Sequence, residues 1–307
     1  MELTRMNLLS AARLFSVKSN IACSSTEIQL GKALAGSLAV YDSVNERIKV
    51  YDAQPSHFIG WNACGILPKL AGKLIAHARP GERLSWLELG FSHEGTIRGY
   101  FRDGSDAHLW AGYLRASRRE PSEIELSERA LTVARSKSRS QKFVPNLGMG
   151  YSSERATEAE AGEIAQLLRD TFSEYPNPLE AEVIARQIRQ KDNCFRTIRD
   201  GQGQLAAVAS AEMDHQRLSA EMTDCATRVE HRGRGLMANL LWLLEQDVRQ
   251  DFKIRDVYTL ARAVEVGMNC AFGKLGYSYC GRLINNCRMP LGWESMNIWS
   301  KRLSDSS

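Results

Sequence analysis

The sequence contains no segment suited to crossing a membrane and no secretory signal. No apolar run approaches the roughly 20 residues that a spanning helix needs. The first twenty residues lack a continuous apolar core and a small-residue cleavage site. Arg5, Arg13 and Lys18 stand there among serines and leucines, so an organelle transit peptide is the alternative to the N-terminal helix or frayed tail that we expect. No membrane partner is predicted.

Metal-ligand patterns are missing as well. None of the seven cysteines belongs to a CxxC pair, and none has a histidine at metal-ligand spacing. The pattern therefore predicts no bound metal, and it favours a reduced, cytoplasmic compartment.

Strong charge of one sign is also absent. A formal net charge of +4 and a pI near 8.7 are too weak to indicate a nucleic-acid partner, although they suit an anionic ligand such as a nucleotide cofactor. What is present, 43% hydrophobic and 25% charged residues, is ordinary for a well-cored protein. At 307 residues the chain exceeds the usual size of one domain, so two are expected.

A change in amino-acid composition near the middle of the chain divides it into two parts. Residues 116–149 are rich in arginine, lysine and serine and end in VPNLG, which is typical of a linker, and hydrophobic spacing within 122–136 predicts a short helix inside it. We therefore expect an N-terminal domain over 1–115 and a C-terminal domain over 150–307. The basic linker is interpreted as a solvated face, with contact to an acidic partner as the alternative.

The second half alternates strands and helices. Thr157 and Glu160 match a capping box before an amphipathic helix that is predicted to end near Tyr175, because Pro176 and Pro178 follow. Further elements are expected as a helix over 179–189, a hairpin turn at Asp200 and Gly201, a strand over 221–229, a helix from Leu236, a strand over 257–261, a helix over 266–275, and strands over 277–285 and 295–301. This order predicts an α/β fold with a mixed sheet.

One motif carries a chemical signal. His231-Arg232-Gly233-Arg234-Gly235-Leu236-Met237 follows a predicted strand and opens a long amphipathic helix. Glycines let a backbone approach a phosphate closely, and the exposed amides of the first helical turn bind an anion. Arg232 and Arg234 add positive charge at the same place.

The halves share a short motif. LGFSHEG (89–95) precedes a strand-like segment, and LGYSYCG (275–281) does the same in the second half. Two copies of one fold would explain this similarity and the chain length, with chance similarity as the alternative. The first half has no counterpart of the glycine-arginine turn, so we expect it to be a degenerate, non-catalytic copy.

Residues 150–307 resemble a GNAT acetyltransferase through RGRGLM and the later N…F…LGY pattern. AEMTDCATRVEHRGRGLM, YTLARAVEVGMN, GRLINNC and WESMNIW are similar to the β-lysine N-acetyltransferases, densely over 172–303 and thinly before that. The resemblance implies a mixed central sheet of the GNAT acyltransferase type, with a degenerate GNAT-like N-terminal domain. It also implies acetyl-CoA as co-substrate, a small-molecule amine as partner, and a role in compatible-solute synthesis.

The resemblance places the cofactor contacts. The backbone of Ala226, Thr227, Arg228 and Val229 is expected to pair with the pantetheine arm like an added strand. The diphosphate is expected at Arg232, Gly233, Arg234, Gly235, Leu236 and Met237, with a further contact from Asn269. One position departs from the family: Phe272 stands where many members have a proton-donating tyrosine, which leaves Tyr277 or Tyr258 as donors, or an unprotonated thiolate beside water.

Acidic residues are the candidates for handling the amine. An amine with a pKa near 10.4 must lose a proton before it attacks, and a carboxylate accepts it. Glu221 and Asp224 are both candidates, and they would face opposite sides of a regular strand unless a bulge intervenes. For the substrate we expect Glu212 to line the cleft, Arg262 to bind a carboxylate, and Asn285, Asn286 and Glu294 to bind a β-amine.

Three other interpretations stay open. In the first, the amine acceptor is α-lysine, a polyamine or an aminoglycoside in place of β-lysine. In the second, the protein binds acyl-CoA as a regulator without turnover, which Phe272 would allow. Cys225 also permits an acetyl-cysteine route, against which we favour direct attack, because strand cysteines are usually small buried hydrophobes. A homodimer is left open.

Overall fold

The chain forms two compact units. The structure, a computed structural model, describes residues 27–32, 38–59, 67–121, 123–137, 143–172 and 179–303. Unit 1 comprises Met1–Thr96, Ser105–Ser122 and Gly281–Met296, and unit 2 comprises Ile97–Gly104, Glu123–Cys280 and Asn297–Ser307. The predicted division into 1–115, 116–149 and 150–307 stays a prediction.

Unit 1 is built around a sheet with one aromatic core. Its elements are β1 (Glu27–Lys32), β2 (Leu38–Asp42), β3 (Arg47–Ala53), the 3-10 helix η1 (Pro55–Phe58), α2 (Leu67–Leu70), β4 (Lys73–Ala78), α3 (Arg83–Glu88), β5 (Ser92–Ile97), β6 (Ala107–Tyr113) and η3 (Ala116–Arg118). Trp86 of α3 is buried between Phe58, Phe91 and the stacked ring of Trp110. These large rings fill a core that the short helices alone would leave open.

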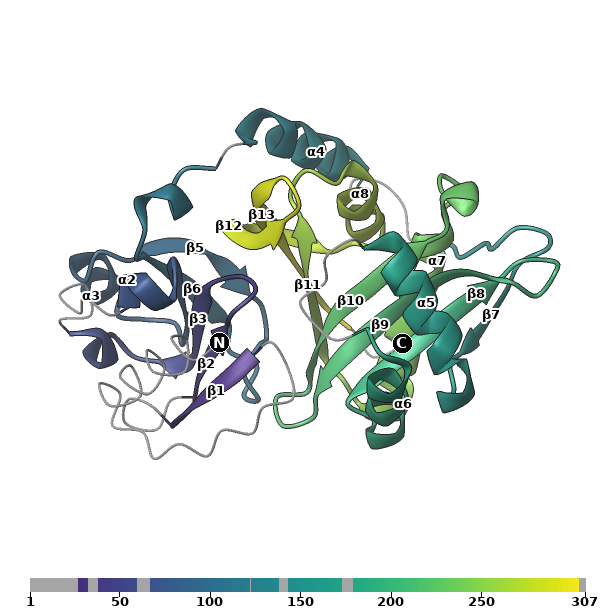
Figure 1. Ribbon diagram of the computed structural model, residues 1–307, viewed down its shortest axis with the longest axis horizontal. Coiled ribbons are helices and arrows are strands. Elements are labelled where there is room, and N and C mark those ends of the chain that lie inside the picture. The colour runs from purple at the N-terminus through teal and green to yellow at the C-terminus, as the bar shows by residue number, and fades with distance from the viewer. Residues whose placement is uncertain are drawn as a thin grey trace. The chain divides into compact units, whose positions relative to one another are not determined.

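Unit 2 carries the longer helices (Figure 1). Its elements are α4 (Ile124–Lys137), β7 (Ser152–Arg155), η4 (Glu158–Glu160), α5 (Ala161–Thr171), α6 (Ala181–Gln190), β8 (Asn193–Arg199), β9 (Leu205–Asp214), β10 (Ser219–Thr227), η5 (Val229–His231), α7 (Leu236–Phe252), β11 (Asp256–Arg262) and α8 (Val266–Lys274). β12 (Ser278–Met289) and β13 (Gly292–Arg302) are shared with unit 1. The predicted mixed α/β fold is confirmed.

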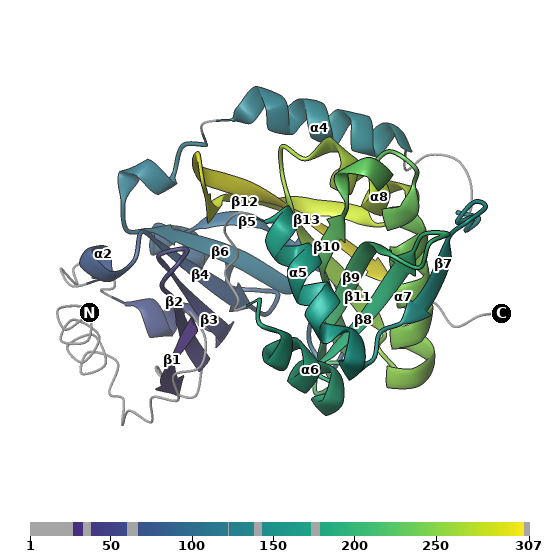
Figure 2. The ribbon, with the colours of Figure 1, turned by 45° about the vertical axis from the view of Figure 1, so that its right-hand side comes forward.

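Helices cover both faces of the unit 2 sheet (Figures 1 and 2). α5 and α6 bury Ile164, Leu168 and Ile184 in one cluster with Val208 and Ala226. α7 and α8 bury a second cluster with the other side chains of the same strands, including Ala220 and Met222. Because side chains alternate along a strand, these clusters assign a face to every residue of β9 and β10.

The strand order of unit 2 repeats that of unit 1. The first half runs β1-β2-β3-β4-β6-β5 across its sheet, and the second half runs β8-β9-β10-β11-β13-β12. The third strand of each set is antiparallel to the second and parallel to the fourth. The two halves therefore share a strand order, as two copies of one fold would, and the degenerate, non-catalytic character of the first copy stays a prediction.

The short repeated motif has the same backbone in both halves. Leu89 (φ −74°, ψ −3°) and Leu275 (φ −80°, ψ 1°) each cap the end of a helix with similar backbone angles, and Gly90 (φ 80°) and Gly276 (φ 81°) follow in the left-handed region. A strand begins two residues after each glycine. Glycine is favoured where φ is positive, so the shared glycine fits the shared turn.

Most of the predicted elements of the second half are confirmed within two residues. The capping box is present, because the Thr157 amide donates to Glu160 Oε2 at 2.9 Å. The helix after it ends at Thr171, earlier than predicted, and residues 173–178, including Tyr175 and both prolines, lie outside the described residues. The linker helix exists as α4, and Leu131 and Ala134 bury it in the α7–α8 core.

Candidate active site

β10 and β11 separate partway along their length. They pair in parallel at Ser219–Asp256, Ala220–Val257 and Glu221–Tyr258, yet β10 continues to Thr227 and β11 to Arg262. The Thr259 hydroxyl donates to the Met222 carbonyl at 2.8 Å just beyond the last pair. The equivalent strands of unit 1 stay paired from Arg47–Lys73 to Ala53–Ala78. We call the unit 2 feature the fork, and the corresponding strands of unit 1 remain closed.

A bulge interrupts β10 beside the fork. Thr223 opposes Ser210 and Ala226 opposes Val208, so two residues, Asp224 and Cys225, stand against one residue of β9. Asp224 has a φ of 48°, and its Oδ2 accepts a hydrogen bond from the Ser210 hydroxyl. The left-handed backbone turns its carboxylate toward the face that carries the Ser210 side chain.

The bulge gathers three carboxylates on the α5–α6 face. Glu212 lies two residues from Ser210 on β9 and directly opposite Glu221 on β10, so both share the Ser210 face with Asp224. In a regular strand the side chains of Glu221 and Asp224 would lie on opposite faces of the sheet. Because of the bulge, they lie on the same face. Like charges directly opposite each other destabilise a sheet, so this arrangement favours a cationic ligand.

The glycine turn lies at the start of α7 and is exposed. Gly233 (φ 76°) and Gly235 (φ 75°) adopt the left-handed backbone, and a Cβ at either position would meet nothing within 4 Å. In the described part of the chain, no amide from Gly233 to Ala238 donates a hydrogen bond to another protein group. Free N–H groups at a helix N-terminus, with the positive end of its dipole, are suited to binding an anion, and the diphosphate contact stays a prediction.

Side chains that the sequence did not single out hold this turn. The Arg234 guanidinium donates to the Tyr151 hydroxyl at 3.0 Å, and that hydroxyl lies 2.8 Å from His231 Nδ1. His231 Nε2 is 3.6 Å from Asp200. Asn239 donates to the Gly235 carbonyl at 3.0 Å. Only the tertiary fold brings Tyr151 and Asp200, both distant in sequence, to the motif.

The two arginines of the motif are differently placed. Arg232 donates through Nε to the Thr227 carbonyl at 3.1 Å, and Arg234 also donates to the Glu230 carbonyl at 3.2 Å. Both side chains are exposed. Guanidinium N–H groups are the donors that phosphate oxygens bind most strongly.

Asn269 has a structural position. It is fully buried, and its amide donates to the carbonyls of Arg262 and Glu265. Its oxygen accepts from Asn297 and from the Trp299 indole at 2.8 Å. Four hydrogen bonds use the capacity of the side chain, so it fixes the β11–α8 turn, and its contact with a cofactor stays a prediction.

Tyr277 is buried under α7 and α8. Its ring packs edge-on against Phe272 at 5.0 Å, and within the described residues its hydroxyl has no hydrogen-bond partner. Burial and the neighbouring Glu245 carboxylate, which Lys301 contacts at 2.6 Å, raise the pKa of Tyr277 well above its usual value. A phenol with a raised pKa holds its proton tightly, which weakens it as a donor.

Cys225 is the second residue of the bulge. Burial of the sulfur and the adjacent Asp224 carboxylate raise the pKa of this thiol. A thiol rather than a thiolate is a poor nucleophile at neutral pH. This environment supports direct attack by the amine over an acetyl-cysteine route.

The remaining substrate candidates fall into two groups. Arg262 pairs with Glu265 at 3.2 Å in unit 2. Asn285, Asn286 and Glu294 belong to unit 1 and are buried, and Asn285 donates to the carbonyls of Ser117 and Glu120. Their roles toward a substrate stay predictions.

Metal-ion clusters and membrane-spanning helices are both absent from the described residues. No group of three His, Cys, Asp or Glu side chains among them is placed to hold a metal ion. No helix among them is long and apolar enough to cross a membrane.

The sequence is similar to those of known acetyltransferases. The model of the acetyltransferase (GNAT) family matches residues 162–277. β-Lysine N(6)-acetyltransferase of Methanosarcina mazei is 33% identical over 252 residues, which cover 76% of this chain and 92% of that protein. The chain belongs to the GNAT acetyltransferase family.

Two further relatives extend the comparison across both units. N-acetyltransferase YodP of Bacillus subtilis is 30% identical over 266 residues, 86% of this chain and 94% of that protein. β-Lysine N(6)-acetyltransferase of Methanococcus maripaludis is 27% identical over 241 residues, 76% and 83% respectively. This GNAT protein is an acetyltransferase, and GNAT acetyltransferases use acetyl-CoA.

Proposed function

We propose that this enzyme transfers the acetyl group of acetyl-CoA to the side-chain amine of β-lysine or a similar small diamino acid. The observation that carries the proposal is the bulge that turns Asp224 to the face of Glu212 and Glu221 beside the fork. Three carboxylates at one place suit an acceptor with two ammonium groups. Two of the relatives are named β-lysine N(6)-acetyltransferases.

The chain's own groups fit the co-substrate. The free amides from Gly233 to Ala238 would hold the diphosphate, together with Arg232 and Arg234. The backbone from Ala226 to Val229 would pair with the pantetheine arm, because β11 has separated from β10 there. When bound, acetyl-CoA supplies a thioester whose carbonyl carbon accepts the lone pair of the amine.

The carboxylates at the bulge would prepare the amine. A lysine-like ammonium with a pKa near 10.4 gives up a proton to Glu221 or Asp224, directly or through one water. Its nitrogen lone pair then forms the C–N bond as the C–S bond breaks, and the electron pair of that bond leaves with sulfur. Because both carboxylates share a face, either reaches the same nitrogen.

The proton for the departing sulfur has two candidate donors in the chain. Tyr258 pairs with Glu221 at the last residue pair before β10 and β11 separate. Its half-buried side chain lies on the same face of the sheet as that of Glu221. Tyr277 is the second candidate, and its raised pKa argues for Tyr258 or water in its place. Phe272 itself has no proton to give.

The product has a property that suits a compatible solute. Acetylation removes one positive charge from β-lysine and leaves one ammonium and one carboxylate, so the product has no net charge. A neutral zwitterion can accumulate without counterions. We therefore propose compatible-solute synthesis in the cytoplasm as the role.

A substrate panel tests the proposal. The purified chain is incubated with acetyl-CoA and, separately, β-lysine, α-lysine, spermidine and an aminoglycoside, and thiol release and product mass are measured. We expect the highest kcat/KM with β-lysine and a single acetyl addition. A higher kcat/KM with spermidine or the aminoglycoside would overturn the assignment of a diamino acid as acceptor. Binding of acetyl-CoA without release of the CoA thiol in the presence of any of these amines would establish the regulator alternative.

A further inference from the structure

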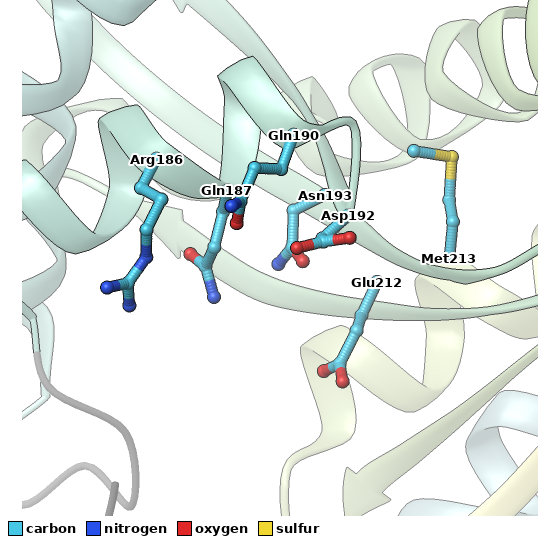
Figure 3. Close-up of a pocket in the computed structure, with 7 residues that line it drawn as sticks. All are labelled: Arg186, Gln187, Gln190, Asp192, Asn193, Glu212 and Met213. Atoms are coloured by element: carbon cyan, nitrogen blue, oxygen red, sulfur yellow. The ribbon is translucent and has the colours of Figure 1, made fainter. Parts of the chain in front are cut away.

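A polar cavity of about 540 Å³ opens on the carboxylate-bearing face of unit 2, between α6 and β9. Seven residues line it: Arg186, Gln187, Gln190, Asp192, Asn193, Glu212 and Met213. In Figure 3 the side chains of Arg186 and Gln187 extend from α6 toward the open space that Glu212 reaches from β9. We infer that this cavity binds the amino-acid end of the acceptor, with Arg186 as the partner of its carboxylate.

The charges of the lining match a diamino acid. Arg186 is the one basic residue of the lining, and Asp192 and Glu212 are its two acidic residues. The amino-acid end of β-lysine carries groups of both signs, one carboxylate and one ammonium group. A diamine without a carboxylate would leave Arg186 unmatched, so the cavity distinguishes the two classes. This inference rests on the proposed function and specifies how its substrate is recognised.

Arg186 is available for this contact. It is exposed, and within the described residues it forms no hydrogen bond or ion pair with the protein. The neighbouring arginine of the same helix, Arg189, contacts Glu158 at 2.6 Å and does not line the cavity. A guanidinium fork binds a carboxylate through two parallel N–H donors, which gives orientation as well as affinity.

The wall that carries Arg186 is held in place. α6 ends at Lys191 in the left-handed region (φ 59°), where the Lys191 amide donates to Ile188 and the Asp192 amide donates to Gln187. The Met213 amide of β9 donates to the Asp192 carbonyl at 2.8 Å. These bonds tie the end of α6 to β9, so the two walls of the cavity are fixed relative to each other before a ligand arrives.

The cavity lies within reach of the bulge. Glu212 is directly opposite Glu221, and the Ser210–Thr223 pair that begins the bulge is two residues along. Strand spacing and rise place that point roughly 8 Å from Glu212. The six bonds from the carboxylate carbon of β-lysine to its side-chain nitrogen span about 7.5 Å when extended. The two lengths are comparable, so an acceptor with its amino-acid end in the cavity can extend toward the carboxylates at the bulge.

Equilibrium binding to the CoA-saturated full chain tests the inference. The ligands are β-lysine and 1,4-diaminopentane, which differs from it only by lacking the carboxylate. We expect the wild type to prefer β-lysine, and Arg186→Ala to raise its Kd at least tenfold while the Kd of the diamine changes less than twofold. Arg189→Ala is the matched control on the same helix and is expected to leave both constants unchanged.

Several results would overturn the cavity assignment. They are absence of β-lysine binding to the wild type, no preference over the diamine, and equal weakening of both ligands by Arg186→Ala. A larger effect of Arg262→Ala than of Arg186→Ala on β-lysine would return the carboxylate to the sequence candidate. The proposed function fails separately: β-lysine that binds through Arg186 but releases no thiol contradicts the reaction and leaves the cavity assignment intact.

Discussion

Gly235→Ala offers a direct test of the diphosphate site, because the chain contains a matched control. Gly235 (φ 75°) and Gly203 (φ 79°) are both exposed, both left-handed, and both open to a Cβ without contact. Alanine in this backbone region costs roughly 1–2 kcal/mol. Both Gly235→Ala and Gly203→Ala should therefore lower the free energy of unfolding by about the same amount.

The two variants should differ in CoA binding. The Cβ at Gly235 would enter the open space beside the free amides of α7, whereas Gly203 lies in the β8–β9 turn. Loss of one or two amide–phosphate bonds, each about 1.5–3 kcal/mol with a charged acceptor, corresponds to roughly a tenfold or larger rise in Kd. Calorimetric titration with CoA measures the affinity, and urea unfolding measures the stability. Equal CoA affinity in the two variants would refute the site.

Three further predictions concern single side chains. Glu221→Gln and Asp224→Asn should each preserve CoA affinity, and the one that removes the base should lower kcat at least ~100-fold in initial-rate assays; a parallel loss of turnover and CoA affinity would remove both from that role. Tyr277→Phe removes a buried hydroxyl without a partner, so thermal unfolding should show unchanged or slightly higher stability with little change in kcat; a large fall in kcat would establish Tyr277 as the donor. Burial lowers the pKa of Lys73 from 10.5 to about 8. Between these two pH values the folded state therefore binds fewer protons than the unfolded state. The free energy of unfolding should rise by about 3 kcal/mol as the pH increases from 8 to 10.5. Urea unfolding at pH 8 and pH 10.5 checks this, and a Lys73→Met/Glu94→Leu double variant should lose the increase; the same rise in that variant would contradict the assignment.

In unit 1 the strand pair that corresponds to the fork is closed. β3 and β4 remain paired to Ala53–Ala78, so no backbone edge is left for a pantetheine arm. Asp52 nevertheless has a φ of 54° at an irregularity in β3, as Asp224 does in β10. The first half thus has an irregular central strand, as the second half does, but without the fork.

The sequence by itself determined the elements of unit 2 and the diphosphate motif. Both are local: the capping box at Thr157, the stripe of α7 and the glycines before it depend on residues a few positions apart. The repeated turn at Leu89 and Leu275 was also visible, because a positive φ requires the same glycine in both copies.

Only the tertiary structure decided the face of Asp224, the fork and the cavity at Arg186. Each depends on which residues of separate strands and helices oppose one another, and a one-residue bulge reverses a side chain without a mark in the sequence. The same holds for Tyr151 and Asp200, which brace the glycine turn from distant segments. Local sequence patterns specify the helices and strands. The register between strands and helices decides which side chains come together at the proposed site.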